Sequence, residues 1–256
     1  MKKALIYFTM IVGIIAFIGA CKSSDDGSST TAGSSAPTSC SDTASGTITG
    51  IDNMSVSGSY SLMLQYGEAS GVDNTTGCTS NASLLSGFSA NLSTDAQSFN
   101  YFRIVTSSTT FATVWKSYTD TSCSTEAVSF AIGDTIQTIG DNVTGLTTGD
   151  YSIGTTGTKV TTTQSCVKGK ASTEAGATWL KSFGNMDGTL GEEKIGSASG
   201  KTYYYLMHAD NSSKRPNSSV TGAIDYTGKV WRSRASDEAH PTDWTAGGAQ
   251  DGFQNY

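Results

Sequence analysis

The two histidines of this chain, with the acidic residues beside one of them, are the side chains whose types and spacing could support catalysis. His240 follows closely after Asp237 and Glu238, and His208 ends a tyrosine-rich segment farther upstream. Histidine is the commonest general acid–base group near neutral pH. These four residues could therefore form a hydrolytic or metal site in an enzyme that acts on a glycan or a peptide.

The alternative interpretation is that both histidines are polar surface residues at the ends of a strand and a loop. The chain contains neither a Gly-x-Ser-x-Gly nor a His-Glu-x-x-His motif. The segment Gly196–Thr202 resembles a phosphate-binding loop but has three residues between its glycines instead of four. The sequence therefore predicts no catalytic residue, no metal ion and no cofactor, and an envelope hydrolase is the second hypothesis.

A partial calcium-binding pattern occurs at Asn185-Met186-Asp187-Gly188, which matches the middle of an EF-hand loop. Phe183 and Lys194 stand where the loop needs its first and twelfth ligands. The segment is therefore not predicted to bind calcium.

Five cysteines are present: Cys21, Cys40, Cys78, Cys123 and Cys166. No two of them form a Cys-x-x-Cys pair, which disfavours a zinc site. The last four could form two disulfides in an oxidising compartment, and the count leaves three pairings open.

The composition indicates an exported β protein. Charged residues make up 15% of the chain, below the usual roughly 25%, and the formal net charge is −6. An acidic chain without a basic stripe is a poor ligand for nucleic acid. Serine, threonine and glycine are abundant, and uncharged, β-branched polar residues suit the solvent face of strands.

The N-terminus is predicted to be an export signal. Lys2 and Lys3 precede an apolar stretch, Ala4–Phe17, whose length suits a signal peptide and is short for a membrane span. The next residues, Ile18-Gly19-Ala20-Cys21, resemble the lipobox of bacterial lipoproteins. A plain N-terminal membrane helix that happens to contain a cysteine is the alternative.

The lipobox resemblance implies that residues 1–20 are removed and that Cys21 becomes linked to diacylglycerol and acylated on its new amine. Several acyl chains hold a protein on a membrane almost irreversibly. Residue 22 is Lys and not Asp, which by resemblance to the sorting rule of enteric bacteria implies the outer membrane, on its periplasmic or its surface face. Without residues 1–20 the chain has 16 − 2 = 14 basic and 22 acidic side chains, a charge of −8.

Three regions are expected along the chain: the signal peptide at 1–20, a lipidated cysteine with a flexible tether at 21–56, and one antiparallel β domain at 57–256. The tether is expected because serine, threonine and glycine dominate it, and about 30 such residues would span on the order of 30 Å. A second possibility is two small β domains divided near residues 167–175.

Alternating apolar residues predict the strands of this domain, in a sheet with one face open to water. They fall near residues 60–64, 101–105, 111–115, 127–132, 202–207, 220–225 and 229–232. Trp179, Leu180 and Phe183 predict one short helix between Ala171 and Phe183. Residues 84–92 show no clean period, 184–200 is expected to be a loop, and the tail from Ser236 is polar and turn-rich. The predicted fold class is all-β, an antiparallel barrel or sandwich.

A second resemblance covers residues 57–165. Tyr118-x-Asp120-x-x-Cys123, followed by Gly149-x-Tyr151-x-x-Gly154, resembles a pattern in small exported bacterial lipoproteins that are often described as calycin-like, lipocalin-related barrels. The resemblance implies a barrel with a Cys78–Cys123 bridge and, with it, a Cys40–Cys166 bridge. Most of these proteins have no assigned activity.

These observations predict a lipid-anchored envelope protein with a binding or structural role. Its partner would be an apolar small molecule inside the barrel, or another envelope or host protein. Five aromatic residues are the candidate ligand-lining side chains, and plain core packing is their alternative role: Tyr101, Phe111, Trp115, Tyr203 and Tyr205.

Overall fold

The structure, a computed structural model, describes residues 37, 39–62, 76–146, 155–210, 229–244 and 250–255. Its strands are β1 (Ile48–Ile51), β2 (Met54–Val56), β3 (Ser59–Leu62), β4 (Ser98–Val105), β5 (Thr110–Tyr118), β6 (Glu126–Thr144), β7 (Thr156–Ala171), β8 (Glu193–Ser197), β9 (Thr202–Asp210), β10 (Lys229–Ser236) and β11 (Gln250–Asn255). Its helices are α2 (Ala82–Gly87), α3 (Glu174–Gly184) and a short 3-10 helix, η2 (Ser89–Asn91).

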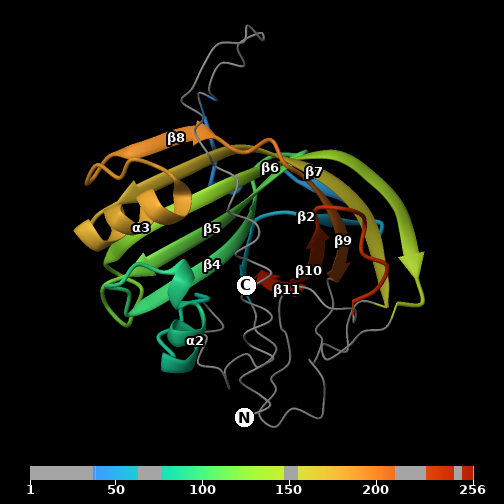
Figure 1. Cartoon of the computed structure of the whole chain (residues 1–256). Helices are drawn as coiled ribbons and strands as arrows, with labels where there is room; N and C mark the ends of the chain where they lie inside the picture. Colours follow the sequence, from blue (N-terminus) through green and yellow to red (C-terminus); the bar gives the residue numbers. More distant parts are fainter. Residues whose placement is uncertain are drawn as a thin grey trace, which may run out of the picture.

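Eight of these strands close into an antiparallel barrel (Figure 1). Around the ring the order is β3, β4, β5, β6, β7, β9, β10 and β11, and β11 pairs back onto β3 through Phe253 opposite Leu62. The predicted all-β antiparallel fold is therefore confirmed. Strands from both halves of the chain share the ring, so a boundary near 167–175 would cut through β7.

Strand β7 has two different neighbours on the same edge. Residues Thr158–Thr163 pair with β9, whereas Cys166–Lys170 pair with the short strand β8. On its other edge β7 pairs with β6 along almost its whole length, which builds the long curved hairpin seen in Figure 1. The barrel wall is therefore continued by β8 at one end, and helix α3 lies against the wall there.

Helix α3 confirms the helix that the sequence predicts. Thr173 caps its N-terminus by accepting a hydrogen bond from the Gly176 N–H at 3.0 Å. Its apolar face packs Trp179 against Phe130 of β6, with ring centroids 6.0 Å apart. Gly169 of β7 lets Leu180 of the helix lie close to the sheet, because a Cβ at position 169 would lie 2.6 Å from a methyl carbon of Leu180.

The core of the protein fills the barrel. On β4, Phe99, Tyr101, Arg103 and Val105 alternate with outward residues, and the inward apolar side chains join one buried cluster. Helix α2 and η2 bring Phe88 and Leu92 onto this cluster at the Phe99 end of β4. The β1–β2 hairpin adds further apolar side chains to the same cluster.

The predicted boundary of the tether at residue 56 is wrong. Ile48, Ile51 and Val56 are buried in the barrel core, with exposed fractions of 0%, 0% and 2%. Serine, threonine and glycine dominate residues 22–56, so the average composition of this stretch gave no sign of three buried apolar residues. Their spacing matches a short hairpin. The folded domain therefore includes the β1–β2 hairpin and the residues from Cys40 that lead into it.

The sequence pattern predicted a sheet with one face open to water. In the structure this outer face is partly covered. Ala112, Val114 and Ala131 on this face are buried. The segment before β1 runs over this region: Asp42 pairs with Lys168, and the Ser45 N–H donates to the Val105 carbonyl at 2.8 Å. We name residues 40–46 the strap.

Three further differences from the sequence prediction concern element boundaries. The expected loop at 184–200 contains β8, the expected polar tail contains β11, and the segment without a clear period contains α2 and η2. Asn81 caps α2 by accepting from the Ser83 and Leu84 N–H groups. The strand predicted at 220–225 lies outside the described residues.

Candidate functional site

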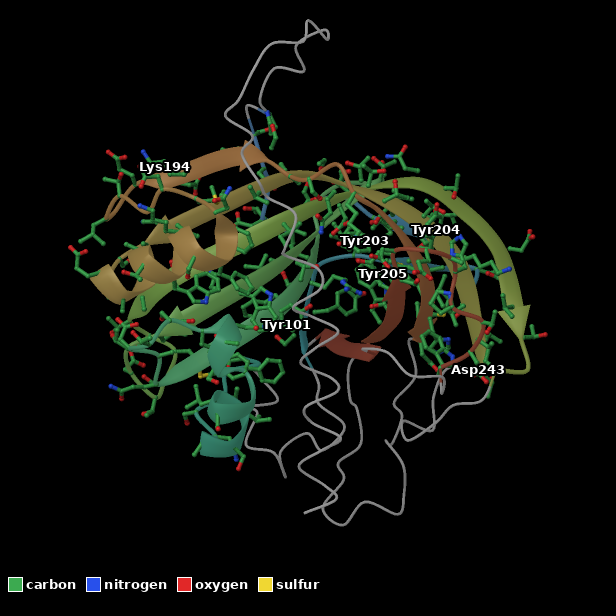
Figure 2. The ribbon with its side chains drawn as sticks, in the orientation of Figure 1. Tyr101, Lys194, Tyr203, Tyr204, Tyr205 and Asp243 are labelled. Carbon is green, nitrogen blue, oxygen red and sulfur yellow. A yellow bond between two sulfur atoms is a disulfide. The ribbon has the colours of Figure 1, made fainter. Side chains whose placement is uncertain are left out.

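The five aromatic residues predicted to line a ligand site all lie in the barrel core. Figure 2 labels three of them, Tyr101, Tyr203 and Tyr205. Each is buried, with an exposed fraction of 5% or less. They pack on one another: the Tyr101 and Trp115 rings stack at 3.9 Å, and Phe111 meets Tyr205 edge-on at 6.0 Å. The structure therefore brings the predicted set together, in contacts typical of a packed core.

Arg103 lies among these rings and is a buried cation, with an exposed fraction of 2%. Its guanidinium carbon lies 5.1 Å from the ring centroid of Trp231 and 5.2 Å from that of Phe111. Its Nη1 donates a hydrogen bond to the Ser233 hydroxyl on β10. Burial of a cation is costly unless it is paired, and aromatic faces and an anion both reduce that cost.

The anion that acts on Arg103 is Asp134 of β6, which is 2% exposed. Burial raises the pKa of the Asp134 carboxyl from 3.8 to about 6, and the Thr162 hydroxyl and the charge of Arg103 oppose this rise. The Thr162 hydroxyl donates to Asp134 Oδ1 at 3.0 Å. At neutral pH the carboxyl is therefore largely ionised and offsets the charge of Arg103.

This raised pKa predicts a pH-dependent stability. A carboxyl with a folded-state pKa above its unfolded value stabilises the fold when it is protonated, and this contribution is lost as pH rises from about 4 through about 6. The difference of 6 − 3.8, or about 2 pKa units, corresponds to roughly 3 kcal/mol. Asp134→Asn does not titrate, so its unfolding free energy relative to wild type should rise by roughly that amount between pH 4 and pH 7.

Urea unfolding of both proteins at several pH values measures this difference. A gap between the Asp134→Asn variant and wild type that stays constant from pH 4 to pH 7 would contradict the raised pKa.

His208 is not the surface residue that the alternative interpretation of the sequence assumed. It is 7% exposed, and its Nδ1 lies 2.5 Å from Asp52 Oδ2 at the tip of the β1–β2 hairpin. The same carboxylate oxygen accepts from the Ala209 N–H at 3.2 Å, and the Asp52 N–H donates to the Thr158 hydroxyl at 2.7 Å. We call the contacts of Asp52 with β7 and β9 the hairpin latch.

His240 has separate partners. Its Nδ1 lies 2.9 Å from the Tyr205 carbonyl and its Nε2 lies 3.3 Å from the Thr161 hydroxyl. Asp237, which the sequence grouped with it, instead pairs with Lys201 at 2.6 Å. Among the described contacts, none joins the two histidines, and each histidine holds a loop or hairpin against the barrel.

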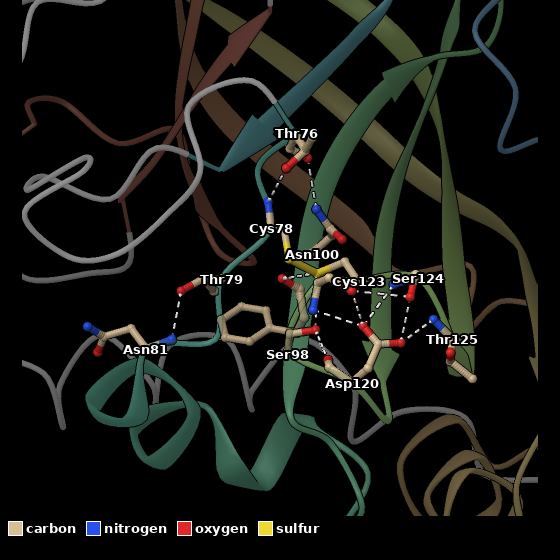
Figure 3. Close-up of a disulfide and its surroundings, with 12 residues drawn as sticks. Thr76, Cys78, Thr79, Asn81, Ser98, Asn100, Asp120, Cys123, Ser124 and Thr125 are labelled. Carbon is tan, nitrogen blue, oxygen red and sulfur yellow. Dashed lines mark hydrogen bonds between the residues drawn. A yellow bond between two sulfur atoms is a disulfide. The ribbon is translucent and has the colours of Figure 1, made fainter.

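The four cysteines form the two bridges that the second resemblance implies. Cys78–Cys123 joins the segment before α2 to the turn between β5 and β6 (Figure 3). In this turn the Asp120 carboxylate accepts hydrogen bonds from the backbone N–H groups of Ser122, Ser124 and Thr125, which lower its pKa below the usual range. The carboxylate therefore fixes the turn that presents Cys123.

The second bridge, Cys40–Cys166, fixes the strap to the outer face of β7. Gly133 of β6 lies opposite Cys166, and a Cβ at Gly133 would lie 2.6 Å from the Cys166 sulfur. The bridge therefore needs glycine at this position. Cys21 lies outside the described residues.

Sequence reasoning did not find Arg103, Asp134 or Asp52. For Arg103 a signal was present, because it occupies the same alternating face as Phe99, Tyr101 and Val105, which are apolar or aromatic. A charged residue at an inward position points to a buried ion pair. Asp134 and Asp52 give no such signal, because each stands beside turn-forming residues.

In the part of the chain that the structure describes, no group of three or more His, Cys, Asp or Glu side chains is placed to hold a metal ion. A search of the same residues finds no helix that is long and apolar enough to cross a membrane. Compared with models of protein families and with curated proteins, the chain matches none.

Proposed function

We propose that this chain is a lipid-anchored lipoprotein of the bacterial cell envelope. The observation that carries the proposal is the order of its first residues: two lysines, an apolar stretch, and Ile18-Gly19-Ala20-Cys21. The resemblance of this order to a lipobox implies that Cys21 carries the lipid. By the resemblance at residue 22, the anchor would hold the protein on the outer membrane.

The disulfides support export. Two bridges in one domain are typical of oxidising compartments and rare in the cytosol. Cys40, the first bridged residue, stands 40 − 21 = 19 residues after Cys21. The proposed anchor therefore stands shortly before the strap in the sequence.

The packing of the core favours a role for the outer surface of the barrel. A small-molecule site usually needs a cavity of roughly 300 Å³ or more, whereas the rings of Tyr101, Trp115, Phe111 and Tyr205 lie against one another. We therefore propose a structural role or the binding of another envelope or host protein. A hydrolase would need His208 and His240 at one site, and their separate contacts do not favour it.

Replacement of the lipidation residue tests the anchor. Cys21→Ser, expressed in a bacterium with a lipoprotein pathway, should lose label from radioactive palmitate and move from the membrane fraction to the soluble fraction. The Cys40→Ala/Cys166→Ala variant is the matched control, because it also removes cysteines and should stay lipidated. A Cys21→Ser variant that remains labelled and membrane-bound would contradict the proposal.

A further inference from the structure

The segment between η2 and β4 contains a group of buried polar atoms without hydrogen-bond partners. They are Oδ1 and Nδ2 of Asn91, Oγ of Ser93 and Oδ1 of Asp95. Asn91 is 1% exposed and Ser93 is 4% exposed. Buried polar side chains in native proteins are nearly always paired, so a group of them within five residues indicates a ligand that supplies the missing interactions.

The three residues lie within one short stretch of bend and turn between η2 and β4. Leu92, between Asn91 and Ser93, is extended, with φ −127° and ψ 151°, and its side chain belongs to the barrel core. The chain bends at Leu92, so Asn91 ends η2 just before the bend and Ser93 follows just after it. A turn follows, in which the Ala96 N–H donates to the Ser93 carbonyl at 3.0 Å, and it keeps Asp95 close to Ser93.

We propose that Asn91, Ser93 and Asp95 bind a calcium ion. Their oxygens are a side-chain amide, a hydroxyl and a carboxylate, at the i, i+2, i+4 spacing of the first three ligands in a calcium loop. Calcium accepts six to eight oxygens in a flexible geometry, so backbone carbonyls and waters can complete the shell. A calcium-bound water would also accept the Asn91 Nδ2 hydrogen.

The charges of the three ligands also indicate how tightly this site would bind calcium. Only one of the three ligands is charged, and few charged ligands are typical of extracellular calcium modules with dissociation constants of about 10⁻⁴ to 10⁻³ M. The ion would hold the segment that carries Phe88 and Leu92. These residues close the α2 end of the core, where the Phe88 ring lies 5.8 Å from that of Trp115. Bound calcium would therefore stabilise this end of the barrel.

Calorimetric titration of the full chain, freed of metal with a chelator and kept in detergent, measures the site with CaCl₂ alone. We expect one calcium per chain and a rise in Tm of about 4 °C when calcium reaches ten times its Kd. Magnesium demands a stricter octahedral geometry and should give no comparable shift. If calcium up to 10 mM gives no heat of binding and no Tm shift, the proposal is overturned. A buried water at the site would give this result.

Three variants distinguish calcium binding at this site from a general effect of salt on stability. Asp95→Asn should weaken calcium binding about tenfold or more, whereas Asn91→Asp adds a charged ligand and should strengthen it about tenfold. Asp187→Asn is the matched control, because Asp187 is an exposed aspartate in the segment that only partly matches an EF-hand loop. Equal calcium responses in Asp187→Asn and Asp95→Asn, or an Asn91→Asp stability change that does not depend on calcium, would contradict the assignment.

Discussion

Removal of the Cys40–Cys166 bridge, in a variant with alanine at both positions, should lower the free energy of unfolding by about 5 kcal/mol. The bridge closes a loop of 126 residues, and loop closure restricts the unfolded chain more as the loop grows. It also fixes the strap over the buried outer residues Ala112 and Ala131. Urea unfolding in non-reducing buffer measures the loss.

The other disulfide provides the comparison. Cys78–Cys123 closes a loop of 45 residues, so alanine at both of its positions should cost about 4 kcal/mol. Limited proteolysis should cut the strap in the Cys40→Ala/Cys166→Ala variant and leave it intact in the Cys78→Ala/Cys123→Ala variant. If the Cys40→Ala/Cys166→Ala variant unfolds at the same urea concentration as wild type, the strap does not contribute to stability as described.

Loss of the hairpin latch should also have a large effect. Asp52→Ala removes the carboxylate that contacts His208 at 2.5 Å and accepts from the Ala209 N–H at 3.2 Å. A buried polar group left without its hydrogen-bond partner costs about 1–3 kcal/mol, and Asp52→Ala leaves two such groups, the His208 ring nitrogen and the Ala209 N–H. We therefore expect Asp52→Ala to lower the unfolding free energy by about 4 kcal/mol, measured by urea unfolding at pH 7.

Asn53→Ala is the matched control for this substitution. Asp52 and Asn53 both have left-handed backbone angles, with φ of 52° and 60°, which alanine tolerates less well than aspartate or asparagine. Asn53 is exposed, so Asn53→Ala carries the backbone cost of about 1 kcal/mol without the loss of a buried pair. A loss in Asp52→Ala no greater than that in Asn53→Ala would show that the latch contributes nothing.

The fold could be predicted where the local pattern was strong. Tyr101, Val105, Phe111 and Trp115 alternate with other residues in the way that a strand facing a core requires, and β4 and β5 form there. Strand β7 gives a weaker signal, because threonines fill much of its length. One of them, Thr162, faces the interior and donates to Asp134, so a polar residue occupies a core position.

The contacts of the candidate site could not be predicted, because they join residues far apart in the sequence. Asp52 meets His208 across 208 − 52 = 156 residues, and Arg103 meets Ser233 across 130. Such pairs depend on the strand order and on the register, which alternation alone leaves open. His208 therefore looked like a polar residue at the end of a strand, whereas the hairpin buries it.

The mass of the intact native protein, before and after reduction and alkylation, tests the central claim most directly. We predict a mass that fits cleavage before Cys21, three acyl chains including the diacylglycerol, and four oxidised cysteines. Reduction should then expose four thiols to alkylation. A native mass without lipid, or one in which Cys40, Cys78, Cys123 and Cys166 react before reduction, would contradict a lipid-anchored, disulfide-bonded barrel.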